Sequence, residues 1–238
     1  MNHCPFLERL EIAYDEASTG EKDFTHLALL SQLCHVTQLA LSDCDFYGHS
    51  LFTLLETRGS QLKSLTLERV KELNANALDL MGDVCQSLES LALKNCSFQV
   101  DDEEEQAALA DMIEEALDES SPKHFLALQS LTLDLADLST DLEPAKLLLC
   151  QCRPHLASLS LSLGSSSLTV DEEAVLHLLV RFASPLPRLE RFAVPSPSQL
   201  TVHTVNLVVA ACPHVREIGN VDAWRGMRAD DPKSISLT

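Results

Sequence analysis

A nine-residue pattern recurs along the whole chain and restricts the folds that the chain can adopt. In its clearest copy, Leu88–Cys96, apolar residues occupy the first, fourth, sixth and ninth positions. Leu91 and Leu93 are two residues apart, so in an extended strand both point to one face, while the residues beside them point to the other. Each copy therefore predicts a short strand with one buried face, followed by a turn that returns the ninth residue to the core.

The copies are spaced for one strand and one helix each. They start at residues 7, 36, 62, 88, 128, 156, 189 and 215, and three of the intervals between them are 26 residues long. A repeated unit of this length is typical of a solenoid. We therefore predict an α/β solenoid of about eight repeats over residues 1–224. It would be a horseshoe with parallel β-strands on the concave face and helices on the convex face, followed by a C-terminal tail at 225–238.

The segments between the strands carry helix signals. Apolar residues at 51, 54 and 55 form one stripe, and Gly59 is its candidate C-terminal stop. Asn74 or Asn76 is the candidate cap of the next helix, because an asparagine side chain accepts hydrogen bonds from the free N–H groups at a helix start. Further helices are predicted over residues 171–182 and 201–211.

The longest interval, from residue 88 to residue 128, contains an acidic run followed by a helical stripe. The run is 101–105, and the stripe consists of Leu109, Met112, Ile113, Ala116 and Leu117. We predict a helical insertion near 100–122, with the acids at the positive end of its dipole. The run is interpreted as a solvated helix start, and the alternative is that it attracts a basic peptide.

The charge balance restricts the partners of this chain. It has 36 acidic and 17 basic residues, a formal net charge of -19 and a pI near 4.7. Such a balance argues against nucleic acid and against anionic membrane surfaces, and it permits a basic protein partner. No secretory signal is recognised at the start, and no segment approaches the roughly 18 apolar residues of a membrane span.

The eight cysteines follow the repeat instead of forming a disulfide framework. Cys44 and Cys96 occupy ninth positions, and five others precede a first apolar position by two to four residues. They are interpreted as small buried groups with free thiols, which predicts a cytoplasmic or nuclear location. Cys150 and Cys152 are the only close pair, and one pair does not make a zinc site.

The sequence offers little catalytic chemistry. It contains no G-x-S-x-G, G-x-G-x-x-G, phosphate loop or H-E-x-x-H. The alternative is a hydrolase that uses Ser165 with a histidine. His35, His155 and His214 each stand directly before a first apolar position, so they are interpreted as turn residues. We therefore expect a protein that is not an enzyme and that binds no cofactor or metal.

The positions that point away from the core are the remaining candidates for function. Aligned by the repeat, they form columns across the strands, and the centre of these columns is small and polar. It would admit a closely packed peptide or helix, or it would be an idle face. The specificity candidates on this face are Arg9, Gln38, Glu68, Lys94, Asp134 and Arg191.

The 26-residue spacing, the ninth-position cysteines and the Cys-Pro before Leu7 and Val215 resemble the cysteine-containing leucine-rich repeats. These repeats are common in F-box/LRR proteins and in ribonuclease-inhibitor-like solenoids. The resemblance covers about residues 4–220 and is strongest over 36–96.

The resemblance implies a protein–protein interaction module, one that recognises substrates for an SCF-type ubiquitin ligase. In that family an N-terminal F-box binds the Skp adaptor of the cullin ligase, and no F-box precedes Leu7. We therefore expect a fragment, a short isoform or one part of a larger interface, with cullin-ligase components reached through a missing N-terminal region. The alternative is an acidic inhibitor or scaffold that binds a basic protein outside the ubiquitin system.

Overall fold

The structure is a computed structural model, and it describes residues 6–13, 35–44, 46, 51–71, 73–98, 103–118, 124–135, 138–152, 155–163, 186–193, 202–219 and 235–236. These residues form one open sheet whose strand order follows the chain. The first eight strands are parallel, and the ninth is antiparallel to the eighth. The α/β fold and the parallel sheet that the repeat predicts are therefore confirmed.

The strands are β1 (Arg9–Ala13), β2 (Gln38–Ser42), β3 (Ser64–Glu68), β4 (Ser90–Lys94), β5 (Ser130–Leu135), β6 (Ser158–Leu163), β7 (Arg191–Ala193), β8 (Glu217–Gly219) and β9 (Ile235–Ser236). The helices are α2 (Leu51–Arg58), the 3₁₀ helix η1 (Gly59–Gln61), α3 (Ala75–Val84), α4 (Glu103–Leu117), α5 (Leu138–Cys152) and α7 (Val202–Ala211).

The strands pair in the register that the nine-residue pattern predicts. Arg9 lies opposite Gln38, and from β3 to β8 each strand begins opposite the equivalent residue of the strand before it. A slip of one residue would turn every leucine to the other face, so burial of the leucines fixes this register. Leu91 and Leu93 are each only 1% exposed, as their positions in the repeat predict.

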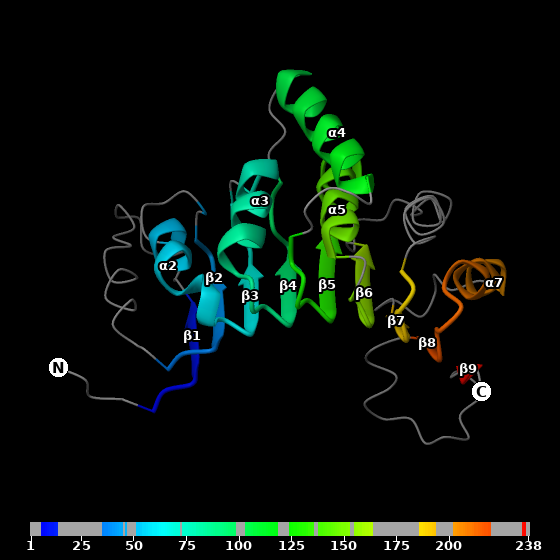
Figure 1. Cartoon of the computed structure of the whole chain (residues 1–238), viewed down its shortest axis with the longest axis horizontal. Coiled ribbons are helices and arrows are strands. Elements are labelled where there is room, and N and C mark those ends of the chain that lie inside the picture. Colours follow the sequence, from blue (N-terminus) through cyan, green and yellow to red (C-terminus); the bar gives the residue numbers. More distant parts are fainter. Residues whose placement is uncertain are drawn as a thin grey trace.

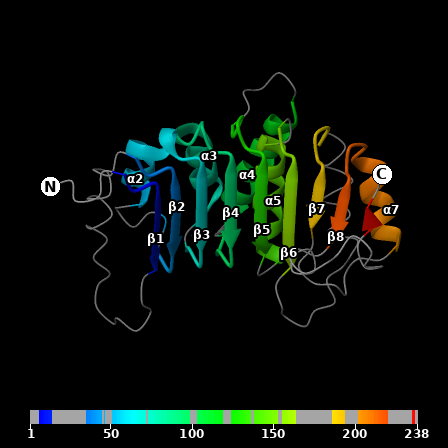
Figure 2. The ribbon, with the colours of Figure 1, turned by 90° about the horizontal axis from the view of Figure 1, so that it is seen from below.

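Helices cover one face of the sheet. α2, α3 and α5 lie in a row above the strands, and α4 packs on α5 further from the sheet (Figure 1). The view from below looks onto the opposite side, where the strands β1 to β8 lie in front of the labelled helices (Figure 2). We call the residues of β1–β8 that point to this side the strand face.

The same turn ends three of the strands. Asp43, Arg69 and Asn95 follow β2, β3 and β4 at 26-residue intervals, and their φ angles are 61°, 52° and 49°. Asp and Asn tolerate this left-handed conformation, in which other side chains are strained. The turn brings the ninth residue of the repeat into the core, where Cys96 is 1% exposed and donates its thiol hydrogen to the Leu67 carbonyl at 3.4 Å.

The helix ends follow the sequence signals in part. Asn74 is the N-cap of α3, and its side chain accepts a hydrogen bond from the Ala77 N–H at 3.0 Å. α2 ends before Gly59 as predicted, but no glycine in the described part of the chain has a positive φ. Gly59 is buried and begins η1, and a Cβ there would lie 2.9 Å from the Val84 carbonyl oxygen. The glycine at the predicted helix stop is therefore required for a close approach to Val84, and not for a left-handed conformation.

The insertion forms the predicted helix α4, whose Leu109, Ile113 and Ala116 are buried. Leu117 is 37% exposed, so its assignment to the buried stripe was wrong. Helix α5 was not predicted, because Pro144 within it is typical of a helix break and its apolar residues show no single stripe. It lies between the sheet and α4, which explains why it is apolar on several sides. The strand β9 was also not predicted. The helix expected over 171–182 and the turn at Ser165 lie outside the described residues.

A clamp holds the chain where it returns from the insertion. The imidazole of His124 lies between two carboxylates of α3, with Nε2 3.2 Å from Asp79 and Nδ1 3.0 Å from Asp83. Gln151 of α5 donates from Nε2 to the same Asp79 at 3.3 Å. Gly82, one turn from Asp79, makes room for the ring, since a Cβ there would lie 2.5 Å from the Cβ of His124.

The variant Gly82→Ala tests this close approach. Replacing a helical glycine by alanine ordinarily stabilises a helix by about 0.5–1 kcal/mol. Here we expect a loss of about 1–3 kcal/mol in the free energy of unfolding, because the added methyl group overpacks the contact with His124. Urea unfolding followed by circular dichroism measures the change. The control, Asn76→Ala at an exposed position of the same helix, should stay within about 0.5 kcal/mol, and a stabilised Gly82→Ala chain would contradict the packing.

The described cysteines are buried and form no disulfide bond, as the sequence predicts. They are Cys44, Cys85, Cys96, Cys150, Cys152 and Cys212. Burial raises the pKa of the Cys85 thiol to about 12 and that of Cys212 to about 11 from an ordinary value of 9.0. Burial, reinforced by Cys150, also raises the pKa of Cys152. The folded chain therefore holds these groups as uncharged thiols.

The raised pKa values predict how stability depends on pH. Above pH 9.0 an unfolded chain releases thiol protons that the folded chain retains up to a pH of about 11 or 12. The contribution of these thiols to stability is therefore complete below pH 9.0 and is lost as the pH rises through this window. Urea midpoints measured across it should fall, and they should fall less in Cys85→Ala. Alkylation by iodoacetamide near pH 8 should be much slower in the folded chain than in urea; equal rates would refute the burial.

Candidate functional site

The strand face has small side chains at its centre. The register places four serines, Ser64, Ser90, Ser130 and Ser158, side by side at the start of the central strands. Two residues further along each strand, the next column alternates Ala and Thr, with Ala92 between Thr66 and Thr132. The columns expected from the sequence are therefore present in the sheet. A backbone or helix of a partner can approach such a surface closely.

Three of the predicted site residues lie together at the carboxyl ends of the central strands. Lys94 of β4 stands between Glu68 of β3 and Asp134 of β5. Lys94 is exposed, and in the described part of the chain no ion pair joins it to either neighbour. Its ammonium group is therefore available to a partner at the middle of the sheet.

Glu68 is held by the turn beside it. Arg69 forms an ion pair with Glu68 and a two-point contact with Asp43, in which Nε and a terminal nitrogen lie 2.6 and 2.7 Å from the two carboxylate oxygens. Hydrogen bonding to Asp43, with the charges of Asp43 and Glu68, raises the pKa of the Arg69 guanidinium. The Glu68 carboxylate is thus oriented by a fixed cation, while Asp43 is buried.

The other three predicted residues lie toward the ends of the sheet. Arg9 is next to exposed Gln38 and forms an ion pair with Glu11 at 3.7 Å. Arg191 on β7 lies 3.1 Å from Glu217 on β8. Exposed pairs of this kind contribute little to stability, so they are free to exchange partners. The structure does not bring these end residues together with the central charges.

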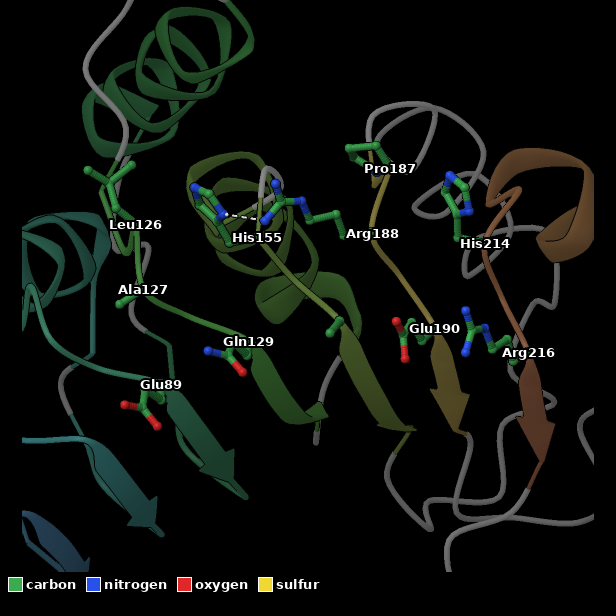
Figure 3. A pocket seen from close by; sticks show the side chains of 11 residues that line it. Glu89, Leu126, Ala127, Gln129, His155, Pro187, Arg188, Glu190, His214 and Arg216 are labelled. Carbon is green, nitrogen blue, oxygen red and sulfur yellow. Dashed lines mark hydrogen bonds between the residues drawn. The ribbon is translucent and has the colours of Figure 1, made fainter.

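A pocket that the sequence did not indicate lies at the other end of the strands. Its volume is about 530 Å³, and it opens along the amino ends of β4 to β8 (Figure 3). We call it the edge pocket. It is lined by Glu89, Leu126, Ala127, Gln129, His155, Ala157, Pro187, Arg188, Glu190, His214 and Arg216.

The edge pocket is built from two columns of the repeat. Ala127, His155, Arg188 and His214 stand directly before the first apolar residue of successive repeats, and Glu89, Gln129, Ala157, Glu190 and Arg216 stand directly after it. Backbone hydrogen bonds align the residues of the second column. The Ala157 N–H donates to the Gln129 carbonyl and the Glu190 N–H donates to the Ala157 carbonyl, each at 2.8 Å. The shared position of His155, Arg188 and His214 was the signal that could have revealed the site.

The arrangement suits binding. The edge pocket offers guanidinium, imidazole, amide and carboxylate groups beside exposed Leu126. No group of three metal-ligating side chains that could hold an ion is found in the described ranges. Among the same residues, every helix is too short or too polar to cross a membrane.

Comparison with known proteins supplies no family for this chain. A scan against protein-family models and a search of curated proteins both found no match. The function is therefore inferred from the chain's own residues.

Proposed function

We propose that the chain is a leucine-rich-repeat solenoid, a horseshoe with a concave strand face, and that it acts as a non-enzymatic protein-interaction module. The observation that carries this proposal is the strand face itself. Its strands pair residue for residue, their leucines point inward, and the central positions facing solvent are Ser, Thr and Ala.

The dimensions of the strand face suit one part of a protein contact. Strands lie about 4.8 Å apart, so eight of them span about 34 Å, and five residues reach about 16 Å. The resulting area, about 500 Å², is less than the roughly 800 Å² per partner of a standard interface. A partner that buries a standard area would therefore also contact residues beyond the strand face, such as those at an edge of the sheet.

A second candidate is an acidic inhibitor or scaffold for a basic protein outside the ubiquitin system. The net charge of -19 favours it, as do the strand-face carboxylates Glu11, Glu68, Asp134 and Glu217. Contacts between exposed charges are screened by salt, so such a complex should weaken strongly as the ionic strength rises. A complex that is unchanged by salt would exclude this candidate.

The proposed role in substrate recognition for an SCF-type ubiquitin ligase rests on the resemblance of the repeat to F-box/LRR proteins. This role needs contact with cullin-ligase components as well as with a client. Affinity capture from a reduced lysate should then recover both. Capture of a client without any cullin-ligase component would remove the ubiquitin role and leave the interaction module.

A pair of matched variants tests binding on the strand face. Ala92→Arg places a large cation at the centre of that face, whereas Ala110→Arg makes the same change at an exposed position of α4 on the helix side. We expect Ala92→Arg to reduce the captured client at least about tenfold, because the side chain blocks close approach, and Ala110→Arg to leave it unchanged. Quantitative mass spectrometry of the captured proteins measures both, and circular dichroism checks the folding of each variant.

Equal capture by the two variants would contradict binding on the strand face. Capture of no specific protein by the unmodified chain would contradict the interaction module as a whole.

A further inference from the structure

The geometry points to a ligand for the edge pocket: an extended segment of a protein partner that presents a carboxylate next to an apolar side chain. This inference rests on the proposed function, since it takes the ligand to be part of a protein. It supplies a contact at an edge of the sheet, beyond the limited area of the strand face.

Two guanidinium groups give the edge pocket its preference for an anion. Arg188 and Arg216 are exposed, and within the described ranges no carboxylate lies at ion-pair distance from either. In a chain with only 17 basic residues and a net charge of -19, two such cations on neighbouring repeats are unusual. A guanidinium binds carboxylates through paired N–H donors.

His155 adds a directed donor. A terminal nitrogen of Arg188 lies 3.3 Å from His155 Nδ1, and the two side chains extend toward one another (Figure 3). Because a guanidinium can only donate, Nδ1 is the acceptor in this contact. The hydrogen of the neutral imidazole is then on Nε2, where it can be donated to a ligand oxygen. Arg188 thus both binds the anion and sets the tautomer of its neighbour.

The hollow exists because one position of the second column holds a small residue. Ala157 stands between Gln129 and Glu190, which carry longer side chains at the equivalent positions of the adjacent repeats. On one side Leu126 is 57% exposed, and on the other Pro187 is exposed. An apolar side chain of the ligand can bury this surface while its neighbour reaches the guanidinium groups.

The length of the edge pocket suits an extended chain. Its lining comes from the residues before β4, β5, β6, β7 and β8. Five strands span about 19 Å, and an extended chain advances about 3.3 Å per residue, so the edge pocket accommodates about six residues.

The acidic groups in the lining favour a carboxylate over a phosphate. Glu89 is paired with Lys63 at 3.4 Å, whereas Glu190 lies beside the extended Arg216 side chain (Figure 3). The excess of positive charge in the edge pocket is therefore small. A phosphate, which carries nearly two negative charges, would meet more repulsion here than a single carboxylate does.

Peptide libraries test the inference on the full chain. In fluorescently labelled hexapeptides, one internal position is Glu, Gln or phosphoserine, the residue before it is Leu and the others vary. We expect the Glu set to be enriched about tenfold over the Gln set. Fluorescence anisotropy then measures the affinity of the best Glu peptides.

Three variants separate the charge, the hollow and nonspecific attraction. Arg188→Gln should weaken these peptides about tenfold by removing the guanidinium. Ala157→Gln should weaken them similarly by filling the hollow, and the adjacent repeat already accepts Gln129 at that position. Lys71→Gln removes an equal charge from an exposed site beyond the carboxyl end of β3, and it should leave the affinity unchanged.

Equal binding of Glu and Gln peptides, or equal losses in Arg188→Gln and Lys71→Gln, would overturn the inference, and a preference for phosphoserine would overturn its choice of carboxylate. Failure of the strand-face experiment alongside a clear preference for Glu would reject binding on the strand face and leave the edge pocket as a peptide site. Success of the strand-face experiment without a preference for Glu peptides would reject only the edge pocket as a peptide site.

Discussion

Backbone hydrogen bonds between equivalent residues of successive strands hold this sheet together, and they extend beyond the strands at both ends. Before β4 and β5, the Glu89 N–H donates to the Lys63 carbonyl at 2.8 Å and the Gln129 N–H to the Glu89 carbonyl at 2.9 Å. After β2, the Asp43 N–H donates to the Glu68 carbonyl at 2.9 Å. One repeat cannot bury its own row of leucines, so each repeat depends on the neighbours that this ladder fixes.

The same ladder separates the positions that maintain the fold from those that bind. Leucines at the fourth and sixth positions of each repeat face the core. The residue at the fifth position points to the opposite face, where it can vary without changing the packing of the leucines. The insertion respects this division. α4 packs on α5 at the helix side, and the His124 clamp returns the chain to α3, so the central strands remain uninterrupted. The longest departure from the 26-residue spacing therefore leaves the strand face intact.

Much of this arrangement could be predicted from the leucines, because a two-residue alternation has only one register that buries it. The columns through Ser90 and Ala92 follow directly. Helix α5 could not be predicted in the same way, because its burial between two layers removes the amphipathic stripe and Pro144 suggests an interruption.

Features that depend on contacts between repeats could not be predicted from the residues of each repeat taken separately. Gly59 and Gly82 are small because another segment approaches them, and that segment is distant in sequence. The edge pocket depends on side chains that become neighbours only once the strands are aligned. Written one repeat above another, the sequence does show Ala157 between two longer residues, and this is the pattern that forms the hollow.

The strand β9 makes the edge of the sheet beside β8 different from the edge at β1. It runs antiparallel to β8, pairing Ile218 with Ile235 and Glu217 with Ser236. Along β8 it occupies the hydrogen-bonding groups that another parallel strand would need, and its own outer edge presents them with the opposite polarity. Where β9 pairs with Glu217 and Ile218, another parallel strand cannot add to β8 in the same sense. The two described residues of β9 thus cover part of an edge of β8 to which another strand could otherwise pair.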